Sequence, residues 1–298
     1  MATPAEWLEG ARLRTLPAAI APVIAGSGVA AHFGGFDGLR ALLALVVALA
    51  LQVGVNYSND YSDGIRGTDS AEHRVGPQRL VGSGAATPRQ VKAAAFGCFG
   101  LAALAGLGLV VLTAAWWLVA VGAACILAAW YYTGGRRPYG YAGLGEAFVF
   151  VFFGLVATCG TTFVQLLGVP MAAVWAGVAT GALACAILVA NNLRDVGGDV
   201  AVGKRTLAVR LGESRTRWFY VVCVVVAVVG VVGAAATSTW WGLLGLLGLV
   251  LLAGPVRLVL GGATGRALIQ VLKLTGLAEL AASVLLFAGL WLGAWLGR

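Results

Sequence analysis

The chain has 298 residues, of which 60% are hydrophobic and only 11% are charged, and its net charge is +8. This composition excludes an ordinary soluble domain, because no soluble domain of this size needs so much apolar surface. The apolar stretches are long and continuous, which predicts membrane-spanning helices rather than the short alternating strands of a barrel. The two histidines are far apart and the five cysteines lie singly in apolar stretches, so neither predicts a zinc site.

The predicted fold is an all-α polytopic membrane protein with nine transmembrane helices. Each apolar stretch has about the 20 residues that a helix needs to cross the hydrocarbon core. The expected spans are residues 14–32, 39–58, 90–112, 114–132, 145–167, 171–190, 216–236, 239–260 and 275–296.

The basic residues predict the orientation of these spans. With the N-terminus placed in the cytoplasm, 18 of the 20 Lys and Arg residues fall on the cytoplasmic side, and only Arg40 and Arg298 do not. This agrees with the positive-inside rule and supports an odd number of spans. The net charge therefore reflects topology, and nucleic acid is not an expected partner.

Two acidic clusters stand out beside these spans. Residues 59–69 (NDYSDGIRGTD) and residues 191–199 (NNLRDVGGD) contain five of the twelve acidic residues, and each cluster follows a span directly. Carboxylates at a membrane edge are costly unless they bind something. Carboxylate and amide oxygens, together with substrate phosphate, are typical magnesium ligands. The two clusters therefore predict a magnesium–diphosphate site that serves a lipid-soluble substrate.

The spacing inside the clusters predicts how their side chains face. Asn59 and Asp63 are four residues apart, as are Asn191 and Asp195, and Asp195 and Asp199. If each helix continues past the membrane edge, these oxygens lie on one helical face. Glycines 64, 67, 197 and 198 are expected to break the helices and let the backbone approach a phosphate.

Basic and aromatic residues near the clusters complete the expected site. Arginine and lysine that follow each cluster can contact the phosphate oxygens that a metal leaves open. A single cluster would more simply be solvated or ion-paired, and it is the match between two clusters that favours a site. Tyr131, Tyr132, Tyr139 and Tyr141 fit either ordinary interfacial aromatics or the lining of an acceptor site. Glu279, inside the last span, fits either a functional acid or a structural ion pair.

The motifs resemble those of the UbiA superfamily of intramembrane aromatic prenyltransferases, and among them the 1,4-dihydroxy-2-naphthoate prenyltransferases. The resemblance spans the whole chain and rests on several segments in order. These are residues 11–17 (ARLRTLP), 59–64 (NDYSDG) with Gly67 and Asp69, 79–81 (RLV), 132–141 (YTGGRRPYGY) and 190–195 (ANNLRD). The third acid of the first motif, Asp69, stands two residues later than the family spacing, which puts its contact with metal in doubt.

The resemblance implies one domain over residues 1–298, a central cavity with a cytoplasmic polar cap, and a bacterial inner (plasma) membrane location. It implies transfer of a polyprenyl group from polyprenyl diphosphate to 1,4-dihydroxy-2-naphthoate, with loss of diphosphate and carbon dioxide, to give demethylmenaquinone. Mg²⁺ is the expected cofactor, and the lipid bilayer surrounds the donor tail.

The residue roles that follow are expectations. The expected magnesium ligands are Asn59, Asp60, Asp63, Asn191, Asp195 and Asp199. Turnover is expected to depend on Asp63, Asp195, Asp199 and Lys204, with Arg66, Arg136, Lys204 and Arg205 binding the diphosphate. The expected acceptor-side residues are Tyr132, Arg137, Tyr139, Tyr141 and Glu146.

Two other functions compete with this interpretation. Another member of the superfamily could take 4-hydroxybenzoate, or a chlorophyll or tocopherol precursor, as its acceptor. A cation transporter or lipid flippase would instead place acidic residues near the bilayer midplane and break its helices there. The acidic residues of this chain gather at one side and its spans look continuous, which disfavours transport.

Overall fold

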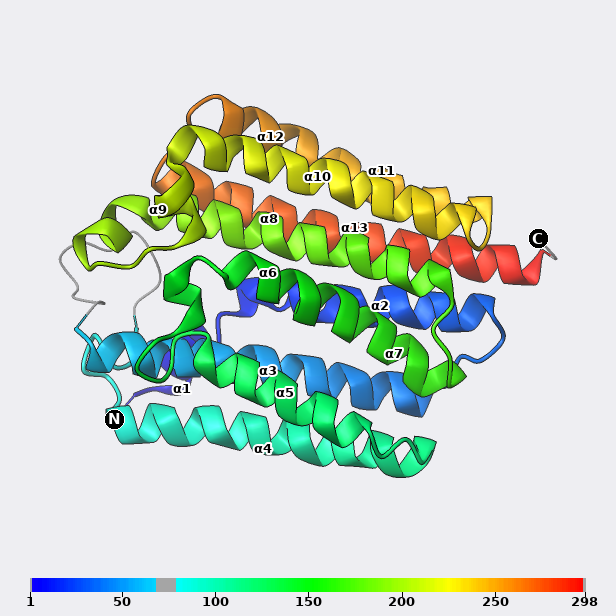
Figure 1. Ribbon diagram of the computed structural model, residues 1–298, viewed down its shortest axis with the longest axis horizontal. Helices are drawn as coiled ribbons and strands as arrows, with labels where there is room; N and C mark the ends of the chain where they lie inside the picture. Colours follow the sequence, from blue (N-terminus) through cyan, green and yellow to red (C-terminus); the bar gives the residue numbers. More distant parts are fainter. Residues whose placement is uncertain (1, 68–78, 297–298) are drawn as a thin grey trace.

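A computed structural model describes residues 2–67 and 79–296 of the chain. Its helices lie roughly side by side along one direction (Figure 1). The elements are α1 (Pro4–Gly10), η1 (Leu13–Thr15), α2 (Pro17–His32), α3 (Gly38–Ile65), α4 (Pro88–Thr113), α5 (Leu118–Tyr131), η3 (Tyr139–Ala142), α6 (Gly145–Val149), η4 (Phe150–Val156), α7 (Ala157–Leu166), α8 (Met171–Ala201), α9 (Leu207–Leu211), α10 (Glu213–Ala236), η5 (Trp240–Leu244), α11 (Gly245–Leu249), η6 (Val250–Leu252), α12 (Ala253–Leu260) and α13 (Arg266–Trp295).

The described residues confirm a polytopic helical protein. Seven of their helices are long and apolar enough to cross a membrane, and there are eight if the bent pair Pro4–Thr15 and Pro17–His32 forms one span. The expected count of nine is not confirmed, because the stretch predicted at 114–132 forms the shorter, 14-residue helix α5. Leu118–Tyr131 alone would rise about 21 Å, less than the hydrocarbon thickness.

Two helices run well beyond the apolar stretches that predicted them. Helix α3 continues to Ile65 and α8 continues to Ala201, so residues 59–65 of the first acidic cluster and the whole of the second are helical. The expectation that glycines break these helices is wrong for residues 64, 197 and 198, which lie inside α3 and α8. Gly64 instead serves close packing, since a Cβ there would lie 2.4 Å from Val81. Gly67 follows α3 with a φ of +69°.

Small residues let the helices approach closely at the end of the bundle away from the acidic clusters. A Cβ on Gly26 of α2 would lie 2.5 Å from the Thr158 carbonyl of α7, and the Thr162 hydroxyl donates to the Gly26 carbonyl at 2.9 Å. In η4, a Cβ on Gly154 would lie 2.5 Å from the Gly177 carbonyl of α8. Such contacts are typical of helices packed in membranes.

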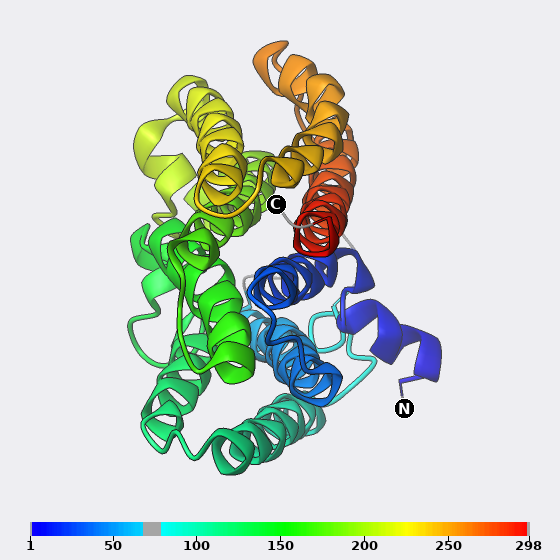
Figure 2. The same cartoon turned by 90° about the vertical axis from the view of Figure 1, so that its right-hand side faces the viewer.

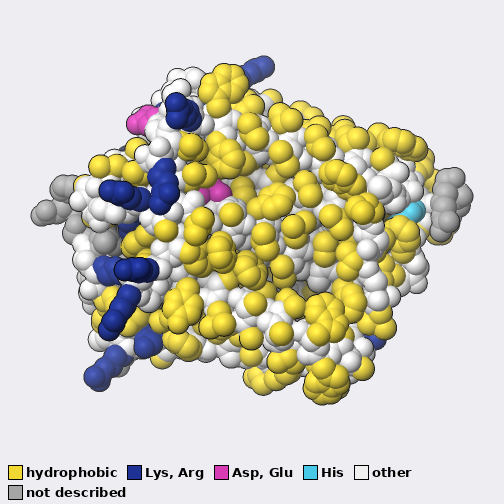
Figure 3. All heavy atoms as spheres, viewed as in Figure 1, with side chains coloured by type: hydrophobic (Ala, Val, Ile, Leu, Met, Phe, Trp, Pro, Cys, Tyr) yellow, Lys and Arg dark blue, Asp and Glu magenta, His cyan; other side chains and the backbone are white. Residues whose placement is uncertain are grey.

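The surface separates charge from apolar side chains. Lysine and arginine side chains gather mainly at one end of the molecule, on the left in Figure 3, and hydrophobic side chains cover most of the rest of the visible face. This end holds the C-terminal turns of α3 and α8, as Figure 1 shows. Figure 2 looks along the bundle from the opposite end. The polar end of the molecule is therefore where the acidic clusters lie.

Candidate functional site

A cavity of about 750 Å³ lies between the helices at the polar end of the bundle. This volume is in the range of cavities that bind small ligands. Helices α3 and α8 line it over several turns, and α1, η1, α2, α5, the segment 132–141, α6, η4, α7, α13, Arg79 and residues 202–206 also contribute. From α3 the lining runs from Ala48 to Asp63, a rise of about 22 Å. The cavity therefore reaches from the polar end into the apolar interior.

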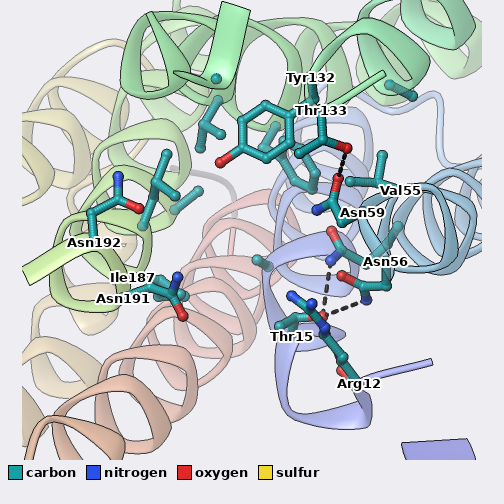
Figure 4. A pocket seen from close by; sticks show the side chains of 18 of the residues that line it. Arg12, Thr15, Val55, Asn56, Asn59, Tyr132, Thr133, Ile187, Asn191 and Asn192 are labelled. Carbon is teal, nitrogen blue, oxygen red and sulfur yellow. Dashed lines mark hydrogen bonds between the residues drawn. The ribbon is translucent and has the colours of Figure 1, made fainter. Parts of the chain in front are cut away.

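The two acidic clusters meet across this cavity. Asn59 and Asp63 of α3, and Asn191, Asp195 and Asp199 of α8, all line it. Figure 4 shows Asn56 and Asn59 on one side and Asn191 and Asn192 on the other. The four-residue spacing therefore places these side chains on one face of each helix, as the helical period predicts. The oxygen atoms of the two clusters face the same cavity.

Asp63 lies at the centre of the polar part of the site. Its carboxylate is 4% exposed and accepts a hydrogen bond from the Tyr141 hydroxyl. Lys204 Nζ lies 3.2 Å from Oδ1, and Arg79 Nη2 lies 3.4 Å from Oδ2. Three segments that are remote in sequence thus converge on one carboxylate, and two positive charges offset its charge. Burial raises the pKa of Tyr141, and the charge of Asp63 raises it further, so this hydroxyl stays a donor.

The α8 cluster carries its own counter-charge. Arg194 donates from Nε to Asp195 Oδ1 at 2.7 Å and from Nη2 to Oδ2 at 2.6 Å, a bidentate pair. The same Nη2 donates to Asn191 Oδ1 at 2.9 Å. Asp199 accepts a hydrogen bond from the Thr206 hydroxyl at 3.5 Å, and its carbonyl accepts one from the Lys204 backbone. The segment after α8 therefore folds back and brings Lys204 over the cavity.

Asn59 and the N-terminal segment form the facing wall. Asn59 Oδ1 accepts a hydrogen bond from the Thr133 hydroxyl at 2.7 Å (Figure 4). Asn56 Nδ2 donates to the Ala11 carbonyl at 2.8 Å and to Thr15 Oγ1 at 3.0 Å. These bonds hold the turn before α2 against α3. As a result Arg12, whose φ is +54°, lines the cavity.

Asp60 does not belong to this lining, contrary to the expectation that it binds metal. It is 0% exposed, and its two carboxylate oxygens accept backbone N–H groups of Leu80 at 2.8 Å and Val81 at 3.0 Å. Asp60 therefore anchors the segment that carries Arg79. We remove Asp60 from the proposed ligand set. Asp69 and Arg74 lie outside the described residues.

The four arginines expected to bind substrate also lie outside the lining: Arg66, Arg136 and Arg205 for the diphosphate and Arg137 for the acceptor. Arg136, Arg137 and Arg205 are exposed, and Arg66 donates to the carbonyls of Thr133 and Gly135. The basic residues that do line the cavity are Arg12, Arg14, Arg79, Arg194, Lys204 and Lys273. Of these, only Lys204 had been assigned a role from the sequence. Loop arginines carry no periodicity that tells which ones turn inward, although Arg12, Arg14, Arg79 and Arg194 all stand in segments that the family resemblance includes.

Four aromatic residues form a continuous column along the cavity. Ring centroids are 5.5 Å apart between Tyr132 and Tyr139, 4.0 Å between Tyr139 and Phe148, and 6.0 Å between Phe148 and Phe152. All four rings line the cavity, as does Tyr141, so the expected tyrosines are brought together. Glu146 is not in the lining. It lies behind Asn192, whose Nδ2 donates to Glu146 Oε1 at 2.9 Å.

The oxygen donors fit a magnesium ion that is shared with a phosphate ligand. Within the described ranges, no three acidic, histidine or cysteine side chains come close enough to form a closed metal site. Mg²⁺ usually keeps an incomplete protein shell, with one or two carboxylates and oxygens from substrate phosphate. The carboxylate and amide oxygens of Asp63, Asn191, Asp195 and Asp199 around one cavity satisfy this requirement.

Comparisons with known proteins agree with this geometry. Residues 19–277 match the UbiA prenyltransferase family. The chain is 54% identical over 282 residues to the 1,4-dihydroxy-2-naphthoate octaprenyltransferase of Mycobacterium tuberculosis, covering 94% of each chain. Its fold resembles a solved digeranylgeranylglyceryl phosphate synthase, with a TM-score of 0.65 at 17% identity over 96% of this chain and 98% of that one. It also resembles a UbiA homologue from Archaeoglobus fulgidus bound to DMAPP and Mg²⁺, with a TM-score of 0.63 at 12% identity over 96% of this chain and 99% of the other.

Proposed function

We propose that this chain, which belongs to the UbiA prenyltransferase family, transfers a polyprenyl group from polyprenyl diphosphate to 1,4-dihydroxy-2-naphthoate in menaquinone biosynthesis. The cavity is the observation that supports this reaction class. Two oxygen-rich helical faces and several cations surround its polar end, and aromatic and apolar side chains line the rest. The naphthoate acceptor follows from the similarity to the mycobacterial enzyme over nearly the whole chain.

The polar end of the cavity is the proposed site of the diphosphate. Asp63, Asp195 and Asp199, with the amide oxygens of Asn59 and Asn191, would hold Mg²⁺ there. When bound, the ion would offset the charge that grows on the diphosphate as the C–O bond breaks. The cations that line this end, Arg12, Arg14, Arg79, Arg194 and Lys204, contact the remaining phosphate oxygens and stabilise the same charge.

The aromatic wall is the proposed place of the allylic group and the acceptor. The rings of Tyr139, Phe148 and Phe152 exclude water, and each aromatic face can stabilise a cation by about 0.5–2 kcal/mol. The ring carbon that bears the carboxylate attacks the allylic carbon as diphosphate leaves, and the neighbouring phenol loses its proton to become a ketone. Loss of carbon dioxide leaves its electron pair in the ring system, and the resulting enolate oxygen takes up a proton. The product is the quinol form of demethylmenaquinone.

The polar end is proposed to face the cytoplasm of a bacterium, with the protein in the inner (plasma) membrane. The gathering of lysine and arginine at that end supports this orientation through the positive-inside rule. We further propose that residues 1–298 form one domain and that α5 is a ninth span. Trp116 and Trp117 before α5 and Tyr131 at its end are exposed aromatics of the kind that anchor helices at membrane interfaces. Reactivity of single cysteines placed at both ends of α5 toward impermeant reagents tests this topology.

Product formation by purified protein in detergent tests the reaction. The assay contains 1,4-dihydroxy-2-naphthoate, a polyprenyl diphosphate and Mg²⁺, with EDTA and 4-hydroxybenzoate as controls. We expect a prenylated, decarboxylated quinol or quinone that requires Mg²⁺. Product from 4-hydroxybenzoate alone would overturn the acceptor but keep the reaction class, and no product from any aromatic acceptor would overturn the proposal.

A further inference from the structure

The amide of Asn192 is held in one orientation by a buried acid. Asn192 lines the cavity and is only 8% exposed, and its Nδ2 donates to Glu146 Oε1 at 2.9 Å. An asparagine amide has two donor hydrogens on nitrogen and acceptor lone pairs on oxygen. A flipped amide would set its oxygen against the carboxylate oxygen, which is repulsive. Glu146 therefore fixes the amide so that its nitrogen points toward Glu146 and its carbonyl oxygen is available to the cavity.

Glu146 is itself fixed to α8 and is closed off from the cavity. It is 5% exposed, and its backbone carbonyl accepts a hydrogen bond from the Cys185 thiol of α8 at 3.0 Å. The residues that line the cavity include Asn192 and Phe148 but not Glu146. Glu146 thus acts on anything in the cavity through Asn192.

The Tyr132 hydroxyl is a second polar group, beside Asn192 Oδ1, that is available to a ligand in the cavity. No described residue makes a hydrogen bond to the Tyr132 hydroxyl or to Asn192 Oδ1. A Cβ on Gly145 would lie 3.7 Å from the Tyr132 hydroxyl and 3.3 Å from Leu188, which is one turn before Asn192 on α8. Figure 4 shows the Tyr132 hydroxyl pointing into the pocket.

Apolar side chains lie around these two atoms. Phe148, Val149 and Leu188 line the cavity around them. An apolar cavity with a few placed polar groups selects a ligand that has matching polar atoms. A site that hydrogen-bonds a substrate hydroxyl rejects an analogue without it, because the polar groups of the site then stay unpaired.

We propose that Asn192 Oδ1 and the Tyr132 hydroxyl bind a ring hydroxyl of the aromatic acceptor, and that Glu146 is a positioning residue that orients Asn192. This inference rests on the proposed function and concerns how the same cavity recognises its acceptor. It assigns Asn192 a substrate contact and makes the pair the determinant that favours a dihydroxylated ring over a ring with one hydroxyl.

The test compares Tyr132→Phe, Asn192→Leu and Glu146→Leu with the conservative variant Glu146→Gln. Removing one neutral hydrogen bond should raise the KM for the acceptor by about three- to tenfold, while the KM for polyprenyl diphosphate stays constant. Glu146→Gln keeps an oxygen that accepts from Asn192, so it should restore most of what Glu146→Leu loses. Tyr131→Phe is the matched control, because Tyr131 is exposed and does not line the cavity.

Inhibition by 1-hydroxy-2-naphthoate, which lacks the 4-hydroxyl, tells which hydroxyl is bound. If the pair binds the 4-hydroxyl, Tyr132→Phe weakens binding of the dihydroxy acceptor but leaves the inhibition constant of this analogue unchanged. If both compounds lose affinity equally, the pair binds the 1-hydroxyl, and the claim that it selects a dihydroxylated ring is overturned.

Three further outcomes would overturn the inference. Equal rises in KM for donor and acceptor would mean a general structural role. Unchanged KM for the acceptor in both Tyr132→Phe and Asn192→Leu would mean that neither atom touches it. A collapse of kcat in Glu146→Gln, with loss of one limb of the pH–rate profile, would make Glu146 the general base. Absence of turnover by the unmodified protein would instead overturn the proposed function and this inference with it.

Discussion

Asp60 and Asp63 share one acidic motif, yet the structure gives them different surroundings, and this difference predicts different behaviour on substitution. Asp60 is fully buried against the backbone N–H groups of Leu80 and Val81, whereas Asp63 lines the cavity. Replacing Asp60 with Asn leaves one oxygen for two N–H donors and turns an NH₂ group toward the other donor. Hydrogen bonds to a charged group contribute about 1.5–3 kcal/mol each, so Asp60→Asn should destabilise the fold by about 3 kcal/mol.

The two variants can be separated by measuring stability and metal response together. Asp60→Asn should lower the thermal denaturation midpoint in detergent by several degrees, because the segment that carries Arg79 loses its anchor. The Mg²⁺ concentration that gives half of maximal activity should stay near that of the unmodified protein. Asp63→Asn, the matched control, should also lower the midpoint because Arg79 and Lys204 lose a charged partner, but unlike Asp60→Asn it should lose turnover and its response to Mg²⁺.

The opposite pattern would refute this division. If Asp60→Asn denatures at the normal temperature and loses its response to Mg²⁺, then Asp60 is a metal ligand in the working enzyme and the segment 79–81 must move to release it. Partial activity with a normal Mg²⁺ response and a lowered midpoint is the result that the structure predicts.

Three further substitutions test the cavity and the packing around it. Lys204→Met removes the charge 3.2 Å from Asp63 and should raise the KM for polyprenyl diphosphate more than the KM for the acceptor in steady-state assays; equal rises would contradict a phosphate contact. Tyr141→Phe should lower activity by the same factor at pH 7 and pH 10, because burial raises the pKa of Tyr141 above 10.0 and the hydroxyl stays protonated; a factor that disappears near pH 10 would contradict this. Gly154→Val should lower the thermal midpoint by overpacking, at a cost of about 1–3 kcal/mol, whereas Gly160→Ala, with no atom within 4 Å of its Cβ, should not; equal midpoints would contradict the close contact of η4 with α8.

Much of the fold was predictable because hydropathy and helical period are local properties of the sequence. They gave the apolar helices and the shared face of Asn59 and Asp63 on α3, and of Asn191, Asp195 and Asp199 on α8. The same local reasoning was wrong about glycines 64, 197 and 198, because a glycine inside a helix costs only about 1 kcal/mol relative to alanine and does not by itself end the helix.

The roles of the basic residues depended on how the loops fold, which no local pattern contains. Arg66 lies within the first acidic motif and Arg79 follows it, but of the two only Arg79 reaches the cavity, because Asp60 holds the segment beside it. Arg66 instead donates to backbone carbonyls of Thr133 and Gly135. The position of Glu146 was not predictable for the same reason. It lies behind Asn192 because α6 packs against α8.

The ion pairs of the cavity connect its structure to ligand binding. Asp63 is already paired with Arg79 and Lys204, and Asp195 with Arg194. A buried carboxylate without such partners would be costly, so these cations stabilise the protein before any ligand arrives. The same cations cannot keep full contact with the carboxylates once those oxygens turn to a metal, and phosphate oxygens then offer them equivalent partners. If metal and diphosphate bound together, phosphate oxygens would replace the carboxylates as partners of Arg79, Arg194 and Lys204. These cations would then place positive charge where the leaving group develops its negative charge.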